Sequence, residues 1–319
     1  AVMQWVHHDG ESIGEHVRFG HLLDIPLRTH TMLCGGSGHL LGNGTDGAAS
    51  TWSDLPCRGG ERLGIAAGLA DRDRVFFAVG TCVVLSATYL ISVALYLVVI
   101  ERWNIAGLRR HKIKSRHPPP TGEAVRAAAM DTAINHLIIR PIVLFAMYPW
   151  LHARLQWAPS ALPTVWVLAE QLIFCMLFDD SWFYCVHRLF HEVGWLYRTV
   201  HKQHHSFKHT HVVAVEYAHP IEDVLCNTLA TIGGALVLRV HLAVFWLYIS
   251  LKLWQSIDAH SGYDLPFPVS PWSAVRWMDC APAHAYHHGE VRGNYGGFFT
   301  FWDHAFGTYR TAAAKRKAT

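Results

Sequence analysis

The 319-residue sequence predicts an all-α integral membrane protein, with about four transmembrane helices beneath a cytosolic helical domain that carries histidine boxes. Three observations indicate this fold class. The chain is 51% hydrophobic and only 16% charged, so it is more apolar than a typical soluble domain. Long apolar segments recur along it. Thirteen of its 24 histidines fall between His187 and His288, many at the three- and four-residue spacing that shares a helix face.

The first apolar segment, Val75–Ile100, contains 26 residues without a charge and is the clearest transmembrane helix. It is long enough, because a span needs about 20 apolar residues. Six basic residues follow within Arg102–Arg116, whereas the segment before the span is mixed in sign. Cytoplasmic loops are enriched in Lys and Arg. The basic loop is therefore expected in the cytosol and the N-terminal segment on the lumenal side.

Three further apolar regions are expected to complete the membrane domain. The second and third spans are Ala133–Leu151 and Leu162–Phe178. The fourth region, Val224–Ile257, is about 34 residues long, which exceeds one span of about 20 residues. It is interrupted by Gly233-Gly234 and Arg239, and therefore predicts a helical hairpin or two half-helices. This topology places all three histidine boxes and the C-terminus in the cytosol.

The sequence divides into four parts. Residues 1–73 are expected to form a flexible lumenal segment, and residues 74–130 hold the first span and the basic loop. Residues 131–310 form the domain with the remaining spans and the boxes, and residues 311–319 form a basic cytosolic tail. The tail matches a K-x-K-x-x retrieval signal, which works only on the cytosolic side, so the endoplasmic reticulum membrane is the expected location.

The histidine boxes carry the strongest chemical signal. They read His187-x3-His191, His201-x2-His204-His205 and His284-x2-His287-His288. On a helix, each box can direct two or three imidazoles at one point, and neutral imidazole is a common metal ligand. Eight histidines are too many for one tetrahedral zinc and suit two metal ions. The sequence therefore predicts a dinuclear metal site, with His260 and His219 as further candidate ligands.

Six carboxylates near the boxes are expected to accept the outer N–H groups of metal-bound imidazoles, which would fix the tautomer of each ring. They are Asp179, Asp180, Glu216, Glu222, Asp258 and Asp303. All-imidazole coordination suits iron, zinc or copper. Two irons are favoured because oxidation of an apolar lipid substrate with dioxygen needs a redox-active metal. Zinc can substitute for iron in a heterologous host without disturbing the fold.

Composition also excludes other classes of protein. The net charge of +3 is too small and too diffuse to indicate a nucleic-acid partner. The seven cysteines include no CxxC pair, so they indicate neither a zinc ribbon nor a disulfide scaffold.

Residues from about 130 to 310 resemble the fatty acid hydroxylase/sterol desaturase superfamily, most closely its C-4 methylsterol monooxygenase branch. The strings that carry the resemblance are His187-Arg-Leu-Phe-His191, His201-Lys-Gln-His-His205, Glu216-Tyr-Ala-His-Pro220, Asp258-Ala-His-Ser-Gly-Tyr263, His284-Ala-Tyr-His-His288, Gly293-Asn-Tyr-Gly296 and Phe301-Trp-Asp-His-Ala-Phe-Gly-Thr308. The third box departs from the branch, because Ala283-His-Ala-Tyr-His-His replaces a more acidic pairing.

The resemblance implies a four-helix membrane anchor under a cytosol-facing histidine cage. It also implies a non-haem diiron centre that uses dioxygen, with electrons from NAD(P)H through cytochrome b5 and its reductase. The implied substrate is a 4-methylsterol, oxidised at its C-4 methyl group. By motif match the eight box histidines are ligands, joined by His260 and His219, and no catalytic residue is expected beyond the metal centre.

Two alternatives to this reading stay open. The same cage would serve a desaturase or hydroxylase of another lipid, such as a C-5 sterol, a fatty acid or a carotenoid, because the apolar channel decides which carbon reacts. A non-catalytic accessory subunit of a membrane complex could also retain the fold. Lipid analysis of a deletion strain distinguishes the first alternative from 4-methylsterol oxidation, because only loss of the latter accumulates 4-methylsterols. Measurements of metal content and oxygen-dependent turnover distinguish an accessory subunit from an enzyme.

Overall fold

The computed structural model describes residues 71–275, 278 and 280–311, and every regular element within them is a helix. The all-α class is therefore confirmed for this part of the chain. The predictions for residues 1–70 and for the K-x-K-x-x tail lie outside the described residues.

The first apolar segment forms one continuous helix, Arg72–Arg102, made of α2 (Arg72–Ala94) and the π-helical η1 (Leu95–Arg102). Asp71 caps its start, because its carboxylate accepts two backbone N–H groups of the first turn, which have no partner inside the helix. The helix ends where the basic loop begins. Its length and apolar composition are sufficient to cross a membrane.

Two more helices meet the same test of length and composition. Gly122–His152 combines α3 (Gly122–Ile134), η3 (Asn135–Ile139) and α4 (Arg140–His152). Pro220–Leu238 combines α7 (Pro220–Glu222), η8 (Asp223–Thr228) and α8 (Leu229–Leu238). Among the described residues there are thus three candidate spans, where the sequence predicts about four. The expected third span lies in the 28-residue helix α5 (Val165–Glu192), which is not one of the three.

The fourth apolar region divides into two helices, as its interruptions predict. The break falls at Arg239, whose left-handed φ of 52° ends α8, and His241 then caps α9 (Leu242–Ala259). Gly233 and Gly234 instead lie inside α8, where they pack against α5. A Cβ on Gly233 would lie 2.2 Å from the ring of Phe178. These glycines therefore allow two helix backbones to approach closely.

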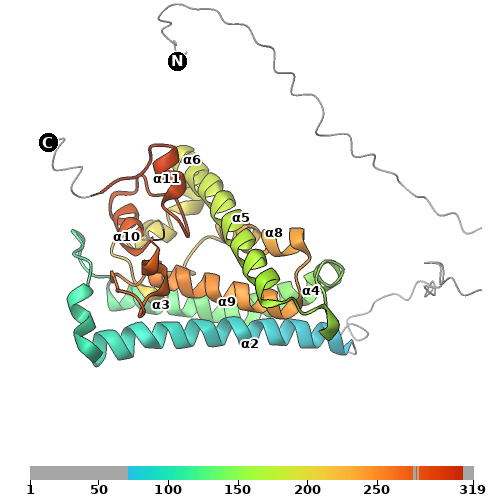
Figure 1. Cartoon of the computed structure of the whole chain (residues 1–319). Coiled ribbons are helices and arrows are strands. Elements are labelled where there is room, and N and C mark those ends of the chain that lie inside the picture. Colours follow the sequence, from blue (N-terminus) through green and yellow to red (C-terminus); the bar gives the residue numbers. More distant parts are fainter. Residues whose placement is uncertain (1–70, 276–277, 279, 312–319) are drawn as a thin grey trace, which may run out of the picture. The chain divides into compact units, whose positions relative to one another are not determined.

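Figure 1 shows how the helices are arranged relative to one another. The α2 helix packs along α4 and α9, while α5 packs on α8. Helices α10 (Cys280–Glu290) and α11 (Phe301–Ala305) lie toward the end of this bundle at which the basic loop follows η1 (Figure 1). Near the same end, one buried core joins Tyr96 and Ile100 of η1 to Ile257 of α9.

Candidate metal centre

The three boxes lie on separate elements. His187 and His191 are one turn apart near the end of α5. The second box spans η5 (Tyr197–His201) and η6 (His204–Ser206), and the third lies on α10. His260 directly follows α9 as its C-cap residue. Tertiary packing is therefore needed to bring these imidazoles together.

Nine imidazoles converge into two groups, and in each group the candidate ligand atoms all lie within 4.8 Å of one another. We call the first group the A cluster; it consists of His187, His191, His201, His205 and His287. We call the second the B cluster; it consists of His204, His260, His284 and His288. The clusters adjoin, since the rings of His205 and His288 have centroids 4.7 Å apart. The structure thus brings together all eight box histidines and His260.

The spacing of the nitrogens fits shared coordination of a cation. In the A cluster, Nε2 of His201 lies 2.8 Å from Nε2 of His191 and 3.0 Å from Nε2 of His205. In the B cluster, Nε2 of His284 lies 3.0 Å from Nε2 of His288. Two imidazole nitrogens bound to one metal at about 2.0–2.1 Å, roughly at right angles, lie about 3 Å apart.

Polar contacts on the outer side of the rings also fit metal binding. Nδ1–H of His187 donates to the carbonyl of Tyr295 at 2.9 Å, and Nδ1 of His201 lies 2.9 Å from the carboxylate of Glu222. His187 then presents an unprotonated Nε2, as does His201 when Glu222 accepts its Nδ1–H, and these two Nε2 atoms are 3.1 Å apart. Two facing lone pairs repel each other unless a cation lies between them. The donor set therefore fits bound metal.

Three more outer nitrogens donate to backbone carbonyls. His287 donates to Gly293 at 2.7 Å and His288 to Phe207 at 3.0 Å. His260 donates to the carbonyl of Ser256 at 2.7 Å. These carbonyls fix the tautomer and the direction of each ring, which is the usual support for a metal-binding imidazole.

Burial keeps these imidazoles neutral. It lowers the pKa of His191 to about 2, that of His204 to about 3 and that of His260 to about 4, and repulsion from neighbouring histidines adds to the effect for the first two. The pKa of His287 is also well below its ordinary value for these two reasons. The clusters therefore offer lone pairs rather than protons at neutral pH.

Of the six candidate carboxylates, only Glu222 contacts a cluster imidazole. Asp180 accepts the backbone N–H groups of Gly297, Phe298 and Phe299. Asp303 accepts those of Tyr295 and Gly296. Both carboxylates thus hold the C-terminal segment whose Tyr295 carbonyl supports His187, so they act on the rings through the backbone.

The other three carboxylates bind other side chains. Asp179 pairs with the buried Lys252, with 3.1 Å between Oδ1 and Nζ. Asp258 accepts the hydroxyls of Tyr96 and Ser270. Glu216 binds His136 and Arg140 on the second candidate span. These groups join helices around the clusters and do not contact the cluster imidazoles.

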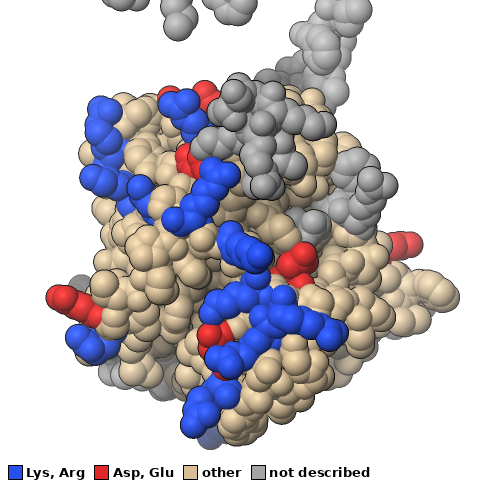
Figure 2. Space-filling model, turned by 90° about the vertical axis from the view of Figure 1, so that its left-hand side faces the viewer, with Lys and Arg blue, Asp and Glu red and all other residues tan. Residues whose placement is uncertain are grey.

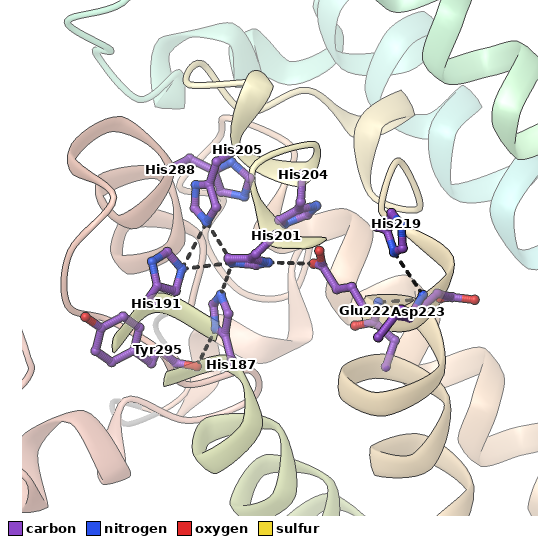
Figure 3. A network of polar contacts seen from close by, with 12 residues as sticks. His187, His191, His201, His204, His205, His219, Glu222, Asp223, His288 and Tyr295 are labelled. Atoms are coloured by element: carbon purple, nitrogen blue, oxygen red, sulfur yellow. Dashed lines mark hydrogen bonds and ion pairs between the residues drawn. The ribbon is translucent and has the colours of Figure 1, made fainter. Parts of the chain in front are cut away.

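His219 lies apart from both clusters, as Figure 3 shows. Its Nδ1 accepts the backbone N–H of Ile221 at 3.2 Å, so the ring caps the first turn of α7. The structure also reveals supports that the box pattern does not identify, namely the carbonyls of Phe207, Gly293 and Tyr295. In the sequence, the Gly293–Gly296 string after the third box points to the last two.

Comparison with known proteins identifies one matching family model and several related enzymes. Residues 172–308 match a family model described as fatty acid hydroxylase. The chain is 31% identical to methylsterol monooxygenase 1 of Rattus norvegicus, over 63% of this chain and 67% of that protein. It is 32% identical to methylsterol monooxygenase 1 of Gallus gallus, over 63% and 67%. It is 32% identical to a cholesterol 25-hydroxylase-like protein of Danio rerio, over 71% and 89%. No solved structure matches the chain.

Proposed function

The chain belongs to the fatty acid hydroxylase family, and on that premise we propose that it is a membrane-bound diiron oxygenase that oxidises a sterol, at the C-4 methyl group of a 4-methylsterol. The observation that carries the proposal is the convergence of nine buried imidazoles into the adjoining A and B clusters. The names of the matched relatives add the reaction class and the type of substrate.

The protein's own residues prepare the clusters for metal. The outer hydrogen bonds orient the Nε2 lone pairs inward, and burial keeps the rings unprotonated. His187, His287 and His288 are at most 1% exposed, so the surrounding side chains exclude bulk water. Iron held at the two clusters would supply the dioxygen chemistry that inserts oxygen into an unactivated C–H bond. Zinc would fit the same donors but would not supply redox chemistry.

The names of the methylsterol monooxygenase relatives support a methylsterol substrate, and we propose the C-4 methyl group as the position that is oxidised. A second candidate is hydroxylation at another position of a sterol. The match to the cholesterol 25-hydroxylase-like protein supports it, because the match covers 89% of that relative. Both candidates share the sterol substrate class and the same metal chemistry. They differ in which carbon the apolar environment presents to the clusters.

We place the clusters and the C-terminus on the cytosolic side of the endoplasmic reticulum membrane. Figure 2 supports this orientation. Lys and Arg side chains gather at the end of the molecule where the first candidate span finishes, and cytoplasmic segments are enriched in these residues. The first half of α5 would add a fourth membrane segment. Its Val165 and Trp166 are 69% and 78% exposed, which suits a lipid environment.

The reaction also needs an external reductant. Hydroxylation consumes one C–H bond, O2, two electrons and two protons, and yields an alcohol and water. We propose that NAD(P)H supplies the electrons through its reductase and cytochrome b5.

Expression in cells that lack their own C-4 methylsterol oxidation tests the proposal. We expect the chain to remove accumulated 4-methylsterols, and His204→Ala to abolish this activity while the protein still accumulates in the membrane. Appearance of a hydroxylated side chain with unchanged 4-methylsterols would favour the second candidate. Unchanged sterols at normal metal content would overturn both.

A further inference from the structure

A basic pocket of about 260 Å³ opens beside the A and B clusters. Its cationic side chains come from three parts of the chain: Lys114 and Arg116 from the basic loop, Lys208 from the segment after the second box, and Arg310 from the C-terminal segment. Glu290 is the one carboxylate among the described lining residues, and it pairs with Arg116 at 3.4 Å. Figure 2 shows the end of the molecule on which basic residues gather.

Helix α10 separates this pocket from the clusters. One face of the helix carries His284, His287 and His288 into the clusters. The opposite face contributes Tyr286 and Gly289 to the pocket wall. Only the thickness of one helix therefore lies between the pocket and the imidazoles.

Hydrogen bonds tie the pocket wall to that helix. The ring of His288 donates to the carbonyl of Phe207, whose neighbour Lys208 lines the pocket. On the other side, Nε2–H of His117 donates to the carbonyl of Gly289 at 2.9 Å, and Nδ1–H of His209 donates to the carbonyl of His117 at 3.2 Å. The backbone segments that carry Lys208 and line the pocket at His117 are thus held in place relative to the B cluster.

We infer that this pocket is the docking site of an acidic one-electron carrier protein, an inference that rests on the proposed oxygenase function. Each hydroxylation takes two electrons and two protons from outside, so the carrier must bind and leave twice in each turnover. A positively charged pocket one helix away from the clusters speeds such encounters with an acidic partner. Because the pocket is small, it would receive carboxylate side chains rather than a cofactor.

An acidic protein fits the site better than an anionic lipid headgroup. In the proposed orientation this end of the molecule projects from the membrane into the cytosol, where a soluble partner can reach it. Neither Lys114 nor Lys208 forms an ion pair within the part of the chain that the structure describes. Both charges therefore remain available to a partner.

The test uses the full chain in nanodiscs, with the soluble haem domain of cytochrome b5, its reductase and NADH as one source of electrons. The other source is anaerobic reduction by dithionite, which is removed before O2 is added. The measured quantity is the ratio of b5-driven to dithionite-driven turnover, which corrects for folding and metal content. We expect Lys114→Glu/Lys208→Glu to lower this ratio about tenfold at low ionic strength, and less in high salt, because the effect is electrostatic.

Arg154→Glu is the control, because Arg154 carries the same charge but follows α4 and does not line the pocket. An unchanged ratio in the double variant would overturn the docking site while leaving the oxygenase proposal intact. So would an unchanged ratio with lost binding to vesicles containing phosphatidylserine, which would assign the pocket to lipid. No turnover by the native protein with either reductant would remove the oxygenase function, and the docking site with it.

Discussion

His204 and His205 are adjacent in the sequence, yet they lie in different clusters: His204 in B and His205 in A. Their ring centroids are 5.6 Å apart and their planes meet at 84°. His287 and His288 divide in the same way, at 5.9 Å and 89°. Two elements therefore each supply both clusters, which links the two candidate metal positions through rigid stretches of backbone.

We expect single substitutions in the second box to affect the clusters separately. His204→Ala should reduce metal bound at the B cluster and His205→Ala metal bound at the A cluster, each by more than about 100-fold in affinity, since loss of an outer partner alone costs 10–100-fold. Metal content after dialysis, measured by elemental analysis, checks this. His219→Ala is the control and should retain the native content, because its ring caps α7. Full metal content in His204→Ala would remove that residue from the site.

Glu222→Gln tests the one carboxylate that contacts a cluster ring. The amide keeps the shape but replaces the carboxyl group that lies 2.9 Å from Nδ1 of His201. We expect metal affinity at the A cluster to fall about 10–100-fold, measured by competition with a chelator. Asp223→Asn is matched in size and position, but Asp223 binds Asn227 and not a cluster histidine. Equal affinities in the two variants would contradict the role of Glu222.

Glu216 should make stability depend on pH. Burial alone would raise its pKa, but Arg140 and His136 outweigh burial and lower the pKa from 4.5 to about 2. Because the pKa is lower in the folded state, this stabilisation is fully present above pH 4.5 and is lost as the pH falls toward 2. Its upper limit is roughly 3 kcal/mol.

Thermal unfolding of the native protein and of Glu216→Gln in detergent measures this effect. The difference in midpoint between the two should be largest at neutral pH and shrink progressively below pH 4.5. A difference that stayed constant down to the acid limit would show that Glu216 acts through packing rather than charge.

Substitutions of the two glycines of α8 should differ in whether a second substitution can restore the lost stability. Gly233→Ala clashes with the Phe178 side chain at 2.2 Å, whereas Gly234→Ala meets the backbone Cα of Cys175 at 2.9 Å. Each should destabilise the protein by about 1–3 kcal/mol, seen as a lower thermal midpoint. Phe178→Leu should recover part of the loss in Gly233→Ala and none in Gly234→Ala. Gly122→Ala, where the added Cβ meets only the end of Arg126 at 3.8 Å, is the control.

Several features could be predicted from local sequence alone. Val75–Ile100 is helical because it is long, uncharged and rich in helix-compatible residues, and the structure extends it only to Arg72–Arg102. The sequence predicts a break between α8 and α9 within Val224–Ile257, at Gly233-Gly234 or at Arg239, and does not decide between them. Gly233 and Gly234 look like helix breakers in the sequence, whereas the chain actually turns at Arg239. Their role depends on the close approach of α5, which is not encoded within α8.

Composition and spacing along the chain predict a helical, apolar protein whose three boxes hold enough imidazoles for two metal ions. Tertiary structure decided that His260 joins the B cluster and His219 does not, and which neighbour in each HxxHH box faces which cluster. The physical reason is that spacing fixes only the faces of one element. Which helix faces come together depends on how helices distant in the sequence pack. It also depends on whether a histidine ring forms a local hydrogen bond instead, as His219 does with the backbone N–H of Ile221.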